Sequence, residues 1–298
     1  MGKKVKFNRQ KYSASEFNDS LLPANRFKQF FDVFKIEWST LLRIGFLFLL
    51  FLLPLILIST FKPVVASFIC ENVVRAGGGQ PEINYALNII NVIYYALCVV
   101  CFLIFSICLA GVSKIIKNLC FGEGVLFRTD FFNGIKENWK RFILFTLIGS
   151  AFFYLTKFND TFFTSSDNFI FKFIIYLATF ILYIFVLPIL FFAMFNQISY
   201  KMNFIECVGN GFKFTLAKIL YSLIFSIIIY GFTFIEKIKH PIVFALVLIL
   251  SIIIVFPLYF LSFHLLSQYI ADEYINKENY KEIYRKGLKP LLIEEKEK

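Results

Sequence analysis

The chain has 298 residues, of which 58% are hydrophobic and only 17% are charged, and its formal net charge is +11. This apolar content is more than a soluble domain of that length buries, so the composition argues against a soluble domain and predicts a membrane protein. The basic residues lie in short segments beside apolar runs. We therefore expect the anionic headgroups of a lipid bilayer, and no nucleic acid, to be their partner.

The first part of the chain predicts an amphipathic helix. No cleavable signal peptide is expected, because roughly forty mostly polar residues precede the first apolar run. Within them, aromatic residues recur at helical spacing, while Lys28, Asp32 and Lys35 lie off that face; the aromatic residues are Phe27, Phe30, Phe31, Phe34 and Trp38. The pattern is typical of an interfacial helix leading into a span, and equally of a transmembrane helix extended into the cytosol.

Six apolar runs follow that are long enough, or nearly so, to cross a bilayer as helices. They are Ile44–Phe61, Tyr85–Ala110, Phe142–Leu155, Phe169–Phe195, Phe214–Ile235 and Ile242–Leu266. The sequence thus predicts an all-α membrane protein with about six transmembrane helices. Its expected parts are a cytoplasmic N-terminal segment with an amphipathic helix (1–43), a six-helix transmembrane domain (44–266) and a charged cytoplasmic tail (267–298).

The distribution of Lys and Arg predicts the orientation. Nine basic residues precede the first span, whereas the next loop offers only Lys62 and Arg75, and this alternation continues along the chain. A multi-pass protein of the bacterial cytoplasmic membrane, with both the N-terminus and the C-terminus in the cytoplasm, is expected.

An internal repeat marks the start of each predicted helical hairpin. The segment Phe31–Trp38 matches Phe132–Trp139 at the aromatic residue, the Lys and the Trp, and Asn210–Lys213 matches them more faintly. We name these three stretches the lead-in segments, and they predict three related hairpins with interfacial amphipathic helices. Trp38 and Trp139, with Lys35 and Lys136 beside them, are candidate interfacial anchors; the alternative is Trp rings buried between helices.

The second span carries a polar stripe. Asn84, Asn88, Asn91 and Tyr95 follow one another in steps of four, three and four residues, so they share one face of a helix. They either form hydrogen bonds across helices or line a wet path.

Three prolines interrupt apolar runs. Pro54, Pro188 and Pro257 each remove a backbone donor and predict a kink in their helix. Such kinks either frame a cavity or serve ordinary packing.

No chemistry is predicted inside the membrane. The predicted spans contain no Asp or Glu, and no protease constellation can be assembled from them. We expect no catalytic residue, no cofactor and no metal site. The leading interpretation is a non-enzymatic accessory or scaffold protein that works with a membrane transport system. The alternative is a small-solute transporter or channel that uses the polar stripe.

The sequence resembles the YesL-type family, bacterial membrane proteins with a domain of unknown function. The resemblance lies in Ala110-Gly111 with the basic run that follows, in GEGVLFRTDFFNGIKENWKRF from Gly122 to Phe142, in Leu53-Pro54-Leu55, and in YINKENYKEIYRKGL from Tyr274 to Leu288. Some members are associated with carbohydrate uptake, so the resemblance implies a transport-accessory role. No catalytic residues are established for this family, and none is carried over.

Overall fold

The computed structural model describes residues 22–163, 169–200, 202–232, 235, 238 and 241–289, and over these ranges it is helical without a strand. The helices are α1 (Arg26–Ile36), α2 (Trp38–Arg75), α3 (Gln80–Phe121), α4 (Phe127–Phe163), α5 (Phe169–Ile181), α6 (Leu187–Ser199), α7 (Phe204–Ala217), α8 (Ile219–Phe232), α9 (Pro241–Leu250), α10 (Phe256–Ala271) and α11 (Lys277–Asn279). Short π-helical segments join α5 to α6, α9 to α10, and α10 to α11.

Five of the continuous helical stretches are long and apolar enough to cross a membrane, and the bent pair α7 and α8 makes a sixth if it counts as one span. The predicted fold class is thereby confirmed. The helices overrun the apolar windows, since α2 has 38 residues and α3 has 42. About 20 residues cross a hydrocarbon core, so both helices must project beyond it or tilt strongly.

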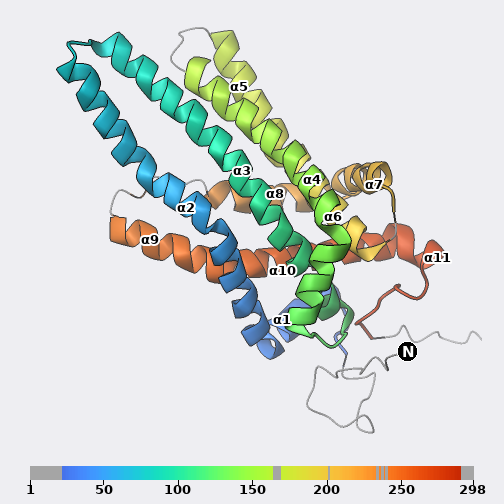
Figure 1. Cartoon of the computed structure of the whole chain (residues 1–298). Coiled ribbons are helices and arrows are strands. Elements are labelled where there is room, and N and C mark those ends of the chain that lie inside the picture. The colour runs from blue at the N-terminus through green and yellow to red at the C-terminus, as the bar shows by residue number, and fades with distance from the viewer. Residues whose placement is uncertain are drawn as a thin grey trace, which may run out of the picture.

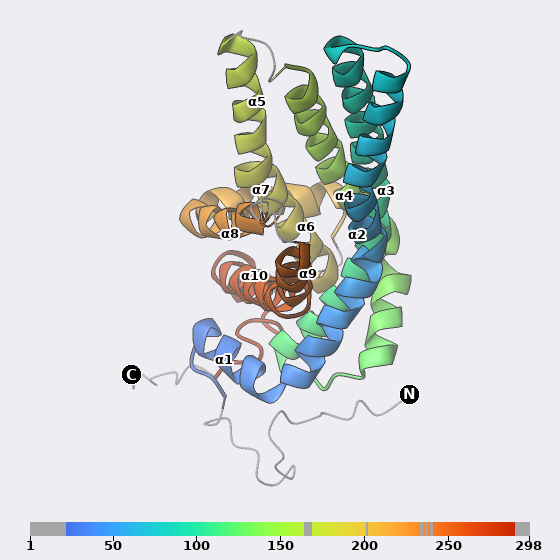
Figure 2. The ribbon, with the colours of Figure 1, turned by 90° about the vertical axis from the view of Figure 1, so that its left-hand side faces the viewer.

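The hairpins do not all run in the same direction. The α2–α3 hairpin and the α4–α5 pair stand side by side, while α8, α9 and α10 cross them at a steep angle (Figure 1). Figure 2 views α8, α9 and α10 nearly end-on, with α2 to α5 upright. The largest cluster of buried side chains lies where α2, α3, α4, α6 and α10 meet, and includes Phe48, Ile116, Phe145 and Phe260.

The three lead-in segments adopt two different arrangements. The first is the separate helix α1, which ends before Glu37, and the third lies in α7, which is bent by 100° from α8. The second is instead the first part of the unbroken helix α4, as in the alternative interpretation of an extended transmembrane helix.

Each lead-in segment packs on the last turns of a helix that ends a hairpin. In α4, a Cβ at Gly134 would lie 2.8 Å from the carbonyl oxygen of Ala110 in α3. In α7, a Cβ at Gly211 would lie 2.5 Å from the carbonyl oxygen of Ile189 in α6. The lead-in helix α1 has no hairpin before it, and it packs on α10, at the other end of the chain. The contact of α1 with α10 therefore joins the first repeat to the third, although the two are at opposite ends of the chain.

The prolines lie within helices, and two of them follow a π-helical segment. Pro54 is inside α2, whereas Pro188 comes after Leu182–Val186 and Pro257 after Ser251–Val255. Proline cannot donate to the carbonyl four residues earlier, which for Pro257 is that of Ile253. That carbonyl lies directly against Gly45 of α2, where a Cβ would overlap it. At this proline, the irregular backbone permits a close helix crossing.

Helices α2 and α10 run across the expected domain boundaries. Helix α2 begins at Trp38, several residues before the predicted start of the transmembrane domain at 44. At the other end, α10 runs through Ala271, and the chain as far as residue 289 packs against α1 and α3. Much of the segment predicted as a charged tail is therefore part of the folded body, because its polar groups find buried partners there.

Candidate functional site

The most unusual polar feature is a row of four side chains on α10 and its continuation, which we name the polar column. His264, Gln268, Asp272 and Asn276 follow one another at four-residue spacing, which places them along one side of the helix. Their exposed fractions are 2%, 1%, 8% and 1%. Polar side chains this deeply buried are kept only where they have partners or a use.

At one end of the column, Asp272 and Asn276 are fully engaged. Asp272 Oδ2 lies 2.6 Å from Arg26 Nη2, and Asp272 Oδ1 accepts from Asn276 Nδ2 at 2.8 Å. Asn276 Oδ1 accepts from the hydroxyl of Tyr200 at 2.6 Å. Burial raises the pKa of the Tyr200 phenol, which keeps it a donor. This end is a neutral, hydrogen-bonded ion pair.

Helix α1 supplies the cation, and two of its polar side chains face the interior of the protein. Arg26 and Gln29 point inward: Arg26 Nη1 donates to Gln29 Oε1 at 2.8 Å, and Gln29 Nε2 donates to the carbonyl oxygen of Cys120 at 2.6 Å. The aromatic rings of Phe27 and Phe31 are exposed instead. Through Arg26 and Gln29, α1 thus forms hydrogen bonds with α3, with Asp272 at the end of α10 and with the C-terminal segment.

The C-terminal segment passes under α1 through a turn that favours glycine. Gly287 has φ +82°, and a Cβ there would lie 2.6 Å from the carbonyl oxygen of Cys120. Arg26 Nη1 also donates to the carbonyl oxygen of Lys286 at 2.9 Å. The turn therefore brings backbone acceptors to the inward face of α1.

The other end of the column is unsatisfied. His264 Nδ1 lies 3.1 Å from the carbonyl oxygen of Phe260, but His264 Nε2 is buried without a hydrogen-bond partner. Both polar atoms of the Gln268 side chain are likewise buried and unpaired within the described chain. The rings of Phe195 and Phe260 lie 5.9 Å and 4.7 Å from the imidazole. The inner half of the column is therefore polar but enclosed by aromatic rings.

The column's chemistry is that of hydrogen bonding and proton exchange. Its only carboxylate is neutralised by Arg26, and its imidazole lies beside aromatic rings and not beside a nucleophile. Over the described residues, no three His, Cys, Asp or Glu side chains are grouped as metal ligands.

The predicted polar stripe of α3 lies on the surface. Asn84 is exposed and accepts from Gln80 Nε2 at 3.1 Å, within its own helix. Asn88 and Asn91 are half-buried, and neither has a hydrogen bond to another described residue. Tyr95 packs edge-on against Phe153 of α4, and the amino group of Lys62 lies 5.2 Å from its ring centroid. The four residues share a face as predicted, and Tyr95 contacts both α2 and α4.

The candidate anchors also lie on the surface. Trp139 is 41% exposed, with Lys140 Nζ 5.6 Å from its ring, and Trp38 is half-buried against Phe34. Lys35 and Lys136 are exposed. Neither Trp ring is buried in the helical core, while their position at the membrane interface stays a prediction.

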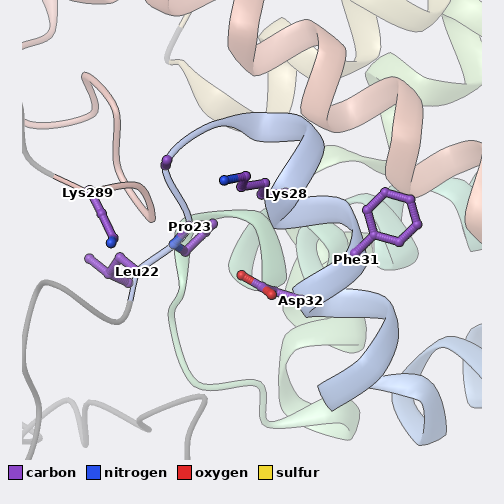
Figure 3. Close-up of a pocket in the computed structure, with 7 residues that line it drawn as sticks. Leu22, Pro23, Lys28, Phe31, Asp32 and Lys289 are labelled. Carbon is purple, nitrogen blue, oxygen red and sulfur yellow. The ribbon is translucent and has the colours of Figure 1, made fainter.

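A shallow, open pocket of about 420 Å³ lies beside α1. In Figure 3, Lys28, Asp32 and Lys289 border it, together with Leu22 and Pro23. It adjoins both ends of the described chain and does not reach the polar column. We therefore place the candidate site at the column.

Sequence reasoning missed the column although its signal was present. The spacing test that found the stripe of α3 also finds His264, Gln268, Asp272 and Asn276. The last two lie beyond the predicted span Ile242–Leu266, and the carboxylate of Asp272 comes later in the same continuous helical stretch, Val243–Asn279.

Comparison with protein-family models, with curated proteins and with solved structures gives no match to this chain. The resemblance to the YesL-type family stays a prediction that these comparisons do not test.

Proposed function

We propose that this integral membrane protein is a non-enzymatic accessory or scaffold protein that binds a second membrane protein through the stripe of α3. The observation that supports this is the position of Asn88 and Asn91. Both are half-buried on a spanning helix and lack a described partner, among exposed apolar residues such as Ile89 and Ile93. A carboxamide that faces lipid is unfavourable, and a polar group on a partner helix would relieve it.

The test is co-purification from membranes in mild detergent, with the double variant Asn88→Leu and Asn91→Leu. We expect a protein recovered with the wild type to be lost with this variant, because two interhelical hydrogen bonds are removed. The matched control is Ile89→Leu with Ile93→Leu, which changes two exposed residues of the same helix and keeps the face apolar. Equal recovery with all three proteins, or no companion protein for the wild type, counts against the proposal.

The bilayer itself is the second proposed partner. Phe27 and Phe31 are exposed on α1, with Lys28 beside them, which forms no ion pair within the described residues. Apolar rings together with a nearby cation suit an interface that carries anionic headgroups, where a Lys gains about 1 kcal/mol. Binding of α1 to lipid would leave its polar inner face free to hold Asp272.

A small-solute transporter or channel is the second candidate function. The polar column supports this function better than the stripe of α3 does. Buried ionisable groups within spans are typical of proton pathways. If the chain conducts protons, liposomes with purified protein should acidify faster than empty ones under a pH gradient. His264→Phe should abolish this flux. Ser267→Ala, three residues further along the same helix, should leave the flux unchanged. A wild type without flux would reject proton conduction.

A further inference from the structure

The unpaired atoms in the inner half of the polar column require partners. Leaving a buried donor or acceptor without a hydrogen bond destabilises a protein by about 1–3 kcal/mol for each group. His264 and Gln268 contribute three such atoms within one helical turn. By contrast, the serine hydroxyl groups on that part of the helix bond locally: Ser262 Oγ donates to the carbonyl oxygen of Leu258 at 2.8 Å, and Ser267 Oγ to that of Phe263 at 2.7 Å.

The chemistry of the three atoms defines what can bind there. A carbonyl oxygen beside His264 Nδ1 means that this nitrogen carries the proton and donates, so Nε2 has a free lone pair. Gln268 offers donors on Nε2 and an acceptor on Oε1. A ligand that satisfies all three atoms must therefore both donate and accept hydrogen bonds.

The surroundings limit the size of this ligand. Beyond His264 the column ends at Phe260, whose ring packs on Phe48 and Phe191 at 6.1 Å and 6.2 Å. Toward the other end, Gln268 is followed one turn later by Asp272 with its full set of partners. A buried water forms two to four hydrogen bonds, which matches the three unpaired atoms between these rings and the ion pair.

We propose that one or more bound water molecules bridge His264 Nε2 and the Gln268 side chain inside the helical body, so that the hydrogen-bonded chain from Arg26 and Asp272 continues to the imidazole. Phe260 flanks the site one turn before His264, and Asp272 flanks it one turn after Gln268. This inference does not depend on either candidate function, because a hydrated column can exist with or without transport.

The first experiment detects the water directly. His240→Gln leaves His264 as the only histidine. With ¹⁵N-labelled histidine in detergent micelles, all imidazole signals then come from this one ring. We expect an Nδ1-protonated ring and cross-peaks from water to its protons. In the Gln268→Met variant these cross-peaks should be lost, whereas Ser267→Ala should keep them. A wild-type imidazole without water cross-peaks would overturn the proposal.

The second experiment measures coupling between residues that do not bond directly. His264→Phe and Gln268→Met should each lower the melting temperature, and the double variant should lower it by no more than the larger single effect, because both break the same bridge. His264→Phe combined with Ser267→Ala should be additive. If Gln268→Met raises the melting temperature, the pocket is dry. Coupling without a water cross-peak would indicate a direct bond between the two side chains and would equally reject the water bridge.

Discussion

Asp272 is the residue on which the most distant parts of the chain converge. Its carboxylate contacts the guanidinium of Arg26, 246 residues away, the backbone nitrogen of Arg285 and the side chain of Asn276. Both partners of the ion pair are nearly buried. An ion pair of this kind adds little over a well-packed apolar pair, but either charge left alone is strongly unfavourable.

Removal of one charge should therefore be costly. We expect Arg26→Met to lower the free energy of unfolding by about 3–5 kcal/mol, because Asp272 would remain buried and unpaired. The measurement is denaturant or thermal unfolding in detergent. The matched control is Lys114→Met, which breaks the half-exposed pair with Glu137 and should change stability by only about 0–1 kcal/mol.

The double variant Arg26→Met with Asp272→Asn separates the two explanations of such a loss. Because it removes both charges, it should recover part of the stability that the single Arg26 variant loses. Additive losses would mean that Arg26 acts through packing alone.

At the residue scale, the sequence predicted which residues share a helical face but not which face is buried. The α1 segment was interpreted from its aromatic pattern, with Lys28, Asp32 and Lys35 off the aromatic face and without a role for Arg26 or Gln29. The structure places Phe27 and Phe31 outward and Arg26 and Gln29 inward. The partners that make this favourable are Asp272 and backbone carbonyls of α3 and the C-terminal segment, and their proximity depends on tertiary contacts that local periodicity does not encode.

At the scale of single helices, glycine determines how closely the lead-in segments approach their neighbours. Gly211 of α7 lies against the backbone of α6. At Gly209, two residues earlier, no atom lies within 4 Å of the position that a Cβ would occupy. Both are helical, so the two positions differ in their surroundings and not in their backbone.

Alanine at these two positions should have opposite effects. Gly209→Ala should raise stability by up to about 1 kcal/mol, through helix propensity alone. Gly211→Ala should lower it, because its methyl group would displace α6. Thermal unfolding of the two variants beside the wild type is the measurement. A stabilised Gly211→Ala protein would show that α6 and α7 are not in close contact.

The existence of the apolar helices could be predicted from hydropathy, but their limits could not. The third apolar run was expected over Phe142–Leu155, while α4 continues from Phe127 to Phe163. Its polar first half is helical because it packs on α3 around Gly134. The break at Lys218 was missed because a single lysine within the apolar run Phe214–Ile235 does not by itself predict a bend, whereas α7 packs on α6 and is bent by 100° from α8.

At the scale of the whole molecule, the expected orientation places the α2–α3 turn outside and the C-terminal segment inside. In a Cys70→Ser background, which removes the one cysteine that is not buried, a membrane-impermeant thiol reagent should modify Gln80→Cys in intact cells. Glu278→Cys should react only after permeabilisation. Both positions are exposed, so access of the reagent reports the side of the membrane. The reverse pattern would overturn the predicted topology.

The contact between α1 and α10 also has a consequence for biosynthesis. Arg26 emerges early from the ribosome, but its partner Asp272 follows 246 residues later. At about 5–20 residues per second, that interval lasts roughly 12–50 s. Throughout it the nascent chain carries an unpaired guanidinium on a helix whose aromatic face already suits the bilayer. A chain that ends before Asp272 lacks the carboxylate that neutralises Arg26, so this ion pair forms only once synthesis has passed the end of α10.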